Sequence, residues 1–148
     1  MKTILFVCTG NTCRSPMAEI ILKNKFKVNG ITDVKVRSAG LSVAEGSKIN
    51  LNSRKALKEL GLKASGFKPR QLTEKMLKST DLVLCMTADH KAYLSKYKNV
   101  YTIAETVGVS DIIDPYGQSE KVYMKTAHAL DYACEIILKN ILKVKGEK

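Results

Sequence analysis

A cysteine and an arginine lie six positions apart directly after the first apolar run of the chain. Residues 8–15 read Cys-Thr-Gly-Asn-Thr-Cys-Arg-Ser, and they follow the run Thr3–Val7. A loop of this length between a strand and a helix can place its backbone N–H groups around a phosphate-sized anion. The spacing therefore favours an anion site with Cys8 beneath the anion and Arg14 closing over it.

The residue types indicate what this segment can do. An ordinary thiol has a pKa near ~8.5, whereas cysteines beside helix N-termini or cationic side chains have pKa values of roughly 3.5–7.5. Loop amides and a following helix both favour negative charge. We therefore expect Cys8 to be an ionised nucleophile. Arg14 carries a planar fork of donors that can hold two phosphate oxygens at once.

The other residues of the loop fit an anion-binding turn that runs into a helix. Gly10 predicts a positive φ and a close backbone approach, and Asn11 tolerates the left-handed region and can brace the loop. Ser15 is expected to cap the helix, with Pro16 at its first position, and its hydroxyl can also donate to the Cys8 sulfur. We expect the phosphate group to contact the following residues: Thr9, Gly10, Asn11, Thr12, Cys13 and Ser15.

Alternating strands and helices must hold this loop in place. Apolar runs predict strands at Thr3–Val7, Val34–Ser38, Asp81–Met86 and Val100–Ile103. Helical spacing predicts helices at Pro16–Val28, Ile49–Leu60, Thr73–Ser79, Asp89–Ser95 and Glu120–Leu142. One apolar stripe of the last helix consists of Ala127, Leu130, Cys134, Ile137 and Ile141. This alternation indicates an α/β fold with a parallel sheet and helices on both faces, and we expect a single domain over residues 1–148.

The segment Val7–Glu19 resembles the signature loop of low-molecular-weight protein-tyrosine phosphatases. Three further segments match that family in the same order, namely Arg37–Gly40, Asp81–Met86 and Asp111–Gly117. The resemblance implies a flavodoxin-like three-layer sandwich with a four-stranded parallel sheet in the order 2-1-3-4. It also implies a phosphatase that needs no cofactor or metal and works through a cysteinyl-phosphate intermediate.

A carboxylic acid is needed opposite the nucleophile, because the leaving atom must receive a proton and the attacking water must lose one. The resemblance assigns this role to Asp114, which Pro115 holds in a stiff loop. Asp111 is a rival by residue type, but no proline and aromatic residue follow it. Tyr116 is expected to form a wall of the substrate pocket.

One feature of the family is missing from this chain. Many members have a histidine shortly before an Arg-Gln pair, and this histidine braces the loop asparagine through a serine. Ser38 matches that serine and is expected to support Asn11, but residues 65–71 contain no histidine. The third member of this network is therefore not predicted from the sequence.

Substrate choice is expected to depend on Thr12. Many tyrosine-directed members have an aliphatic residue here, whereas bacterial protein-arginine phosphatases resemble this chain in having threonine. A hydroxyl suits a guanidinium and its water, and an aliphatic wall suits an apolar ring. The sequence therefore favours phosphoarginine as the substrate, with phosphotyrosine as the alternative.

The remaining cysteines and histidines receive minor roles. The resemblance implies that Cys13 can trap oxidised Cys8 as a reversible disulfide, whereas Cys85 and Cys134 are expected in the core. The four cysteines lack metal-site spacing, so we expect no metal. His90 and His128 are expected to be structural or surface residues without a catalytic role.

Composition places limits on partners and location. The chain of 148 residues has a net charge of +11, but its lysines are scattered rather than clustered. This pattern does not favour nucleic acid as a partner, and binding that falls steeply with salt would be its signature. No signal peptide or membrane-length apolar run is present in the sequence. We expect a cytoplasmic monomer that acts on phosphorylated proteins or peptides and releases inorganic phosphate.

Two further alternatives use a similar loop. An arsenate reductase needs additional cysteines that pass a disulfide outward, and Cys85 has no nearby partner in the sequence. A non-catalytic phosphate-binding or redox-sensing module needs no acid, and Asp114 argues against it.

Overall fold

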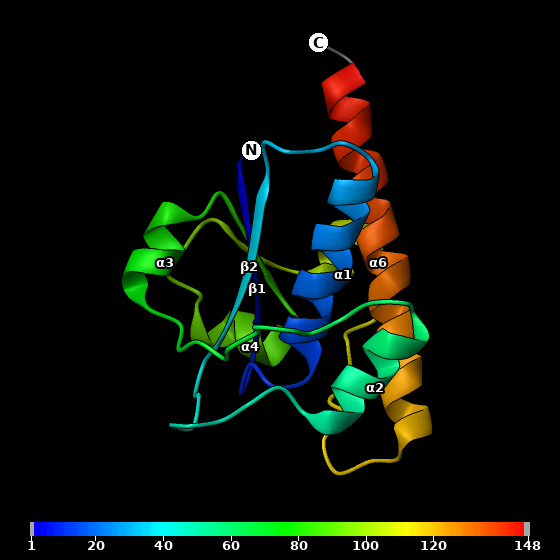
Figure 1. Cartoon of the computed structure of the whole chain (residues 1–148). Coiled ribbons are helices and arrows are strands. Elements are labelled where there is room, and N and C mark those ends of the chain that lie inside the picture. Colours follow the sequence, from blue (N-terminus) through cyan, green and yellow to red (C-terminus); the bar gives the residue numbers. More distant parts are fainter. Residues whose placement is uncertain (1, 147–148) are drawn as a thin grey trace.

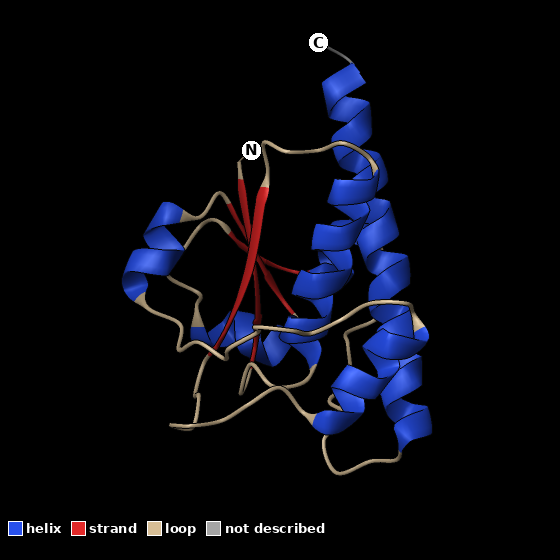
Figure 2. Ribbon diagram, viewed as in Figure 1, coloured by secondary structure: helices blue, strands red, loops and turns tan. Residues whose placement is uncertain are grey.

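Four parallel strands form one sheet in the order β2-β1-β3-β4 (Figure 2). The computed structural model describes residues 2–146. Its strands are β1 (Thr3–Cys8), β2 (Lys35–Gly40), β3 (Leu82–Cys85) and β4 (Val100–Thr102). The predicted strand order is therefore confirmed, and all four predicted strands are present.

Helices cover both faces of this sheet (Figure 1). Helices α1, α2 and α6 lie on one side, and α3 and α4 lie on the other. Their bounds are α1 (Arg14–Val28), α2 (Leu51–Glu59), α3 (Glu74–Ser79), α4 (Ala88–Tyr93) and α6 (Glu120–Gly146). The predicted three-layer sandwich is confirmed. No helix in the described part of the chain has the length and apolar character needed to cross a membrane.

The central strand β1 explains why both layers form. Ile4 and Phe6 point to the core shared with α1 and α6, whereas Leu5 and Val7 point to the core shared with α3. Because successive side chains of a strand alternate between faces, a continuous apolar run is buried on both sides. Cys8 is the last residue of β1 and therefore lies at the carboxyl end of the sheet.

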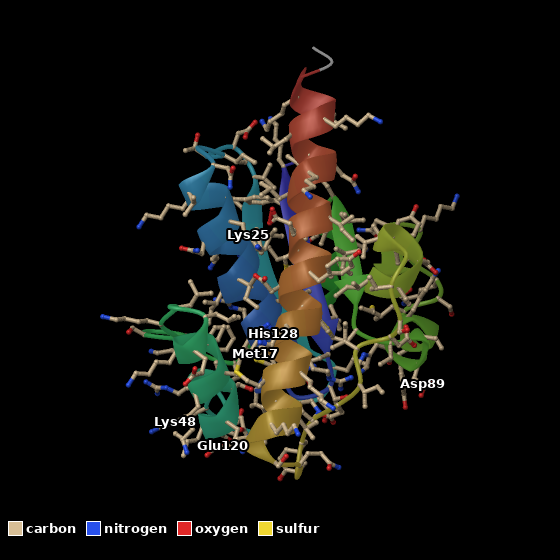
Figure 3. The ribbon with its side chains drawn as sticks, turned by 90° about the vertical axis from the view of Figure 1, so that its right-hand side faces the viewer. Met17, Lys25, Lys48, Asp89, Glu120 and His128 are labelled. Carbon is tan, nitrogen blue, oxygen red and sulfur yellow. The ribbon has the colours of Figure 1, made fainter. Side chains whose placement is uncertain are left out.

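The long helix α6 packs beside α1. The predicted stripe of α6 is buried at all five positions, Ala127, Leu130, Cys134, Ile137 and Ile141. Lys25 of α1 adds a polar connection, because its Nζ lies 3.0 Å from Asp131 and 2.9 Å from Glu135 on α6. Figure 3 shows Lys25 beside α6.

A short helix, α5 (Ile103–Val107), was not predicted from the sequence. The side chain of Thr102 caps it by accepting a hydrogen bond from the backbone N–H of Glu105 at 3.0 Å. Gly108 ends it with a φ of 76°. A threonine followed three residues later by a glutamate is a signature of a helix start, so the sequence contained a signal for α5.

Candidate active site

The loop between β1 and α1 lies at the carboxyl end of the sheet, at the opposite end of β1 from the N-terminus in Figure 1. The segment that follows β2 holds its backbone in place. The carbonyl oxygen of Thr9 accepts a hydrogen bond from the N–H of Ser42 at 2.9 Å, and that of Thr12 accepts one from Asn50 at 2.8 Å. These bonds hold two carbonyl groups of the loop against the segment that follows β2.

The sulfur of Cys8 has a hydroxyl partner. Cys8 Sγ and Ser15 Oγ are 2.8 Å apart, and both residues are buried. The amide of Asn11 donates to the same Ser15 oxygen at 2.7 Å. Because the oxygen accepts from Asn11, its own hydrogen is available to donate to the sulfur. The Ser15 hydroxyl is therefore placed to donate to the Cys8 sulfur.

The prediction that Ser15 caps α1 is wrong. The helix begins one residue earlier, at Arg14, and its N-cap is Cys13, which makes no side-chain cap bond. The Ser15 hydroxyl is engaged with Cys8 and is not a helix cap. Pro16 is still tolerated because it lies in the first turn, where backbone N–H groups have no partner within the helix.

The positive φ predicted for Gly10 is also wrong. Asn11, and not Gly10, has a positive φ, at 55°. The close approach of Gly10 to a bound anion stays a prediction. A different close approach, between the loop and the sheet, occurs at Gly40, at the end of β2. A Cβ at Gly40 would lie 2.7 Å from the carbonyl oxygen of Thr9 and 2.8 Å from the N of Asn11. Because both of these are backbone atoms, a side chain at position 40 would displace the loop.

A buried network holds Asn11 in its left-handed conformation. Its amide donates to Ser38 Oγ at 3.0 Å, and its Oδ1 accepts from the backbone N–H of Arg70 at 2.8 Å. Ser38 in turn donates to Glu19 Oε1 at 2.8 Å, and the guanidinium of Arg70 lies 3.4 Å from the same oxygen. The predicted contact between Asn11 and Ser38 is therefore present. Glu19 and Arg70 complete this network, for which the sequence predicted no third member.

Replacing Glu19 by alanine is expected to loosen this network. Ser38 would lose its buried acceptor, which costs about 1–3 kcal/mol, and the free energy of unfolding should fall by a similar amount. Urea titration of the two proteins measures this change. Glu59→Ala on the exposed surface of α2 is the matched control, and an equal, small effect in both variants would contradict the assignment.

Arg14 lies over the loop and is 4% exposed. Its Nη1 donates to the carbonyl oxygen of Ile112 at 3.0 Å, and its Nη2 lies 3.7 Å from Oδ2 of Asp114. The Asp114 side chain is 50% exposed, and its other oxygen accepts from the backbone N–H of Tyr116 at 3.0 Å. A fixed cation and an accessible carboxyl group therefore face each other at the mouth of the loop.

The structure separates Asp111 from this pair. Asp111 Oδ2 accepts from the backbone N–H of Ala88, in the first turn of α4, at 3.0 Å. Asp111 therefore braces the start of a helix. Tyr116 is 71% exposed and does not line the cleft beside Arg14, where Ile113 lies instead. Its contact with substrate stays a prediction.

A cleft of about 860 Å³ opens from the loop toward α3 and α4. It is lined by residues that include Thr9, Arg14, His90, Tyr93, Ile113 and Asp114. His90 was not predicted from the sequence as a residue of the site. Its place just after β3 was an available signal, because ligands bind beyond the carboxyl ends of strands in such sheets.

Cys13 lies in the loop with a different environment from Cys8. Its sulfur is 3.6 Å from the hydroxyl of Tyr123 on α6 and 3.8 Å from that of Thr12. Burial raises the pKa of the Cys13 thiol. Both Cys8 and Cys13 are free thiols, and the reversible disulfide between them stays a prediction.

Cys85 and Cys134 lie in the core, as expected. Burial raises the pKa of Cys85 to about 12 and also raises that of Cys134. Across residues 2–146, no three His, Cys, Asp or Glu side chains are grouped so that they could hold a metal ion.

Known proteins are similar to this chain in both sequence and fold. The family described as low molecular weight phosphotyrosine protein phosphatase matches residues 3–147. A protein-arginine-phosphatase of Bacillus subtilis is 38% identical over 147 residues, which cover 95% of this chain and 97% of the relative. The low molecular weight protein-tyrosine-phosphatase PtpB of Staphylococcus haemolyticus is 40% identical over 134 residues, covering 87% and 92%.

A solved structure is also similar to this chain. The YwlE arginine phosphatase, in a cysteine-to-serine mutant with a phosphorylated active-site serine, superimposes with a TM-score of 0.88 at 36% identity, covering 95% of this chain and 96% of that one. The class of protein follows from the fold, the loop and the match over nearly the whole chain. This chain belongs to the low molecular weight phosphotyrosine protein phosphatase family.

Proposed function

We propose that this protein hydrolyses phosphorylated side chains of proteins through a cysteinyl-phosphate intermediate, with phosphoarginine as the preferred substrate. The observation that carries this proposal is the pairing of Cys8 Sγ with Ser15 Oγ at 2.8 Å beneath a loop that Arg14 and Asp114 close. The two named relatives, one an arginine and one a tyrosine phosphatase, support the reaction class.

In the first step, the Cys8 thiolate attacks phosphorus while the bond from phosphorus to the leaving nitrogen or oxygen breaks. Loop N–H groups and Arg14 hold the three remaining phosphoryl oxygens and stabilise their charge. The Asp114 carboxyl group donates its proton to the leaving atom. Its exposure and its distance of 3.7 Å from Arg14 support this role, because the leaving group must lie on the open side of the phosphate.

In the second step, the Asp114 carboxylate takes a proton from water, and the resulting hydroxide attacks phosphorus. The sulfur–phosphorus bond breaks, which releases inorganic phosphate and returns the thiolate. The Ser15 hydroxyl stabilises that thiolate by donating to it. The phosphorylated active-site serine in the relative's mutant supports a phosphoryl transfer to the nucleophile's position.

Thr12 supports phosphoarginine over phosphotyrosine. Its side chain is partly buried beside the buried Cys13, and the main-chain contact to Asn50 fixes its position. A hydroxyl at position 12 can satisfy a polar guanidinium, which an aliphatic side chain would leave unpaired. Asp114 can then accept a hydrogen bond from the same guanidinium.

Thr12→Ile is expected to shift the preference toward phosphotyrosine. Loss of the hydroxyl should lower kcat/KM for a phosphoarginyl peptide relative to a phosphotyrosyl peptide by about ten- to a hundredfold. The two peptides are assayed side by side with wild type and variant. Thr12→Val removes the hydroxyl with little change in volume, so it should shift the ratio in the same direction. Unchanged ratios in both variants would exclude Thr12 as the determinant.

The proposal also includes the location of the protein and its oligomeric state. We expect a cytoplasmic monomer whose partners are phosphorylated proteins. Nucleic-acid binding is tested separately by electrophoretic shift at two salt concentrations, because phosphate contacts weaken steeply as salt rises.

A further inference from the structure

His90 connects the phosphate loop to the opposite helical layer. It lies on α4, and only 6% of its surface is exposed. Its Nε2 is 2.9 Å from Oγ1 of Thr9, the residue directly after Cys8. Its Nδ1 is 3.1 Å from Oγ1 of Thr87, which caps the same helix. Both ring nitrogens are therefore engaged.

The hydrogen bonds around Thr87 indicate which ring nitrogen carries the proton. The Oγ1 of Thr87 accepts the backbone N–H of His90 at 3.3 Å as the helix cap. Its single hydroxyl hydrogen is free to donate to Nδ1. When Thr87 donates in this way, the proton of a neutral ring is on Nε2, and Nε2 donates to Thr9.

Burial and the positive charge of Arg14 on α1 lower the pKa of His90 from its ordinary value. Three carboxylates act in the opposite direction, Asp114 and Asp111 from the segment before α6 and Asp89 from α4. Figure 3 shows Asp89 on the side of the molecule away from α1 and α2. The lowering effects are the larger, so we expect an uncharged imidazole at neutral pH.

We propose that His90 is a positioning residue of the phosphate loop, which holds the Thr9 side chain through Nε2–H and so fixes the residue beside the nucleophile. Thr9 is then held twice, by Ser42 at its backbone carbonyl and by His90 at its hydroxyl. This inference rests on the proposed phosphatase function for its kinetic consequences. Its structural part, the Thr9–His90 bond and the tautomer, does not depend on turnover.

A double-mutant cycle tests the bond with inorganic vanadate as the probe. His90→Ala and Thr9→Val should each weaken vanadate binding by about five- to tenfold, the effect of one lost hydrogen bond. The double variant should be no weaker than either single variant, because both remove the same bond. His90→Gln should restore most of the affinity, since its amide can donate near the position of Nε2. His128→Ala on the exposed face of α6 is the matched control.

A second measurement does not involve ligand. Nitrogen-15 NMR of the imidazole should show the Nε2–H tautomer at neutral pH, and Thr9→Val should shift the Nε2 resonance. Kinetics complete the test, since His90→Ala should lower kcat/KM by the same factor as vanadate affinity. Additive losses in the cycle, an Nδ1–H tautomer, or no rescue by glutamine would overturn the proposal. A wild-type protein that binds vanadate but hydrolyses neither phosphopeptide would instead contradict the proposed function. The double-mutant cycle and the NMR spectrum would still test the role of His90.

Discussion

Replacing Cys8 by serine is expected to reduce kcat by roughly 10⁴- to 10⁶-fold, as removal of a nucleophile does in other enzymes. A hydroxyl is far less acidic than a thiol, and the hydrogen-bond partner of this atom among residues 2–146 is the Ser15 hydroxyl, which is not a general base. The loop amides and Arg14 do not depend on the sulfur, so we expect Cys8→Ser to bind inorganic phosphate still. Phosphate release from a phosphopeptide measures the first effect, and calorimetry measures the second.

Cys134→Ser is the matched control for this variant. Cys134 lies in the core, far along the chain from the loop, and its sulfur faces the carbonyl oxygen of Ala18 at 3.8 Å. Serine can keep that contact, so turnover should persist. Full activity of Cys8→Ser would contradict the assignment of Cys8 as the nucleophile.

Iodoacetamide at neutral pH provides a check on the same sulfur without substrate. Burial raises the pKa of Cys13, Cys85 and Cys134, so these three thiols should react slowly. We expect modification at Cys8, with protection by phosphate, and peptide mapping identifies the residue.

Replacing Asp114 by asparagine is expected to lower kcat by about 10²- to 10³-fold, the usual contribution of general acid–base catalysis. The amide cannot give a proton to the leaving atom or take one from water. The loss should be smaller with p-nitrophenyl phosphate, because its leaving group is a weak base that departs without a proton. Comparison of this ester with a phosphopeptide tests the acid role in the first step.

Asp111→Asn is the control, because it makes the same change three residues earlier. An asparagine oxygen can still accept the backbone N–H of Ala88, so kcat should stay unchanged. Equal losses in the two variants would show that the segment, and not the Asp114 carboxyl group, is responsible.

Several side-chain roles could not be read from local sequence. Ser15 and Pro16 have the composition of a helix start, yet α1 begins at Arg14 because the serine hydroxyl is held by Asn11 and Cys8. Gly10 was an obvious candidate for a special backbone conformation, but the contact that needs a glycine is at Gly40, on a different strand. The first role depends on side-chain contacts within the loop, and the second on a contact between the loop and β2.

The sequence by itself determined the alternation of strands and helices and the position of the Cys8–Ser15 loop between the first strand and the first helix. These features depend on apolar periodicity and on the spacing of residues within one short segment, whereas the strand order was expected from the family resemblance. Only the tertiary structure decided how the loop is supported: Asn11 binds Ser38 and Arg70, which lie 27 and 59 positions away, and Thr9 binds His90 at a distance of 81 positions. Such contacts form where the carboxyl ends of strands and the two helical layers meet. They are set by how the layers pack, which no local pattern of residues specifies.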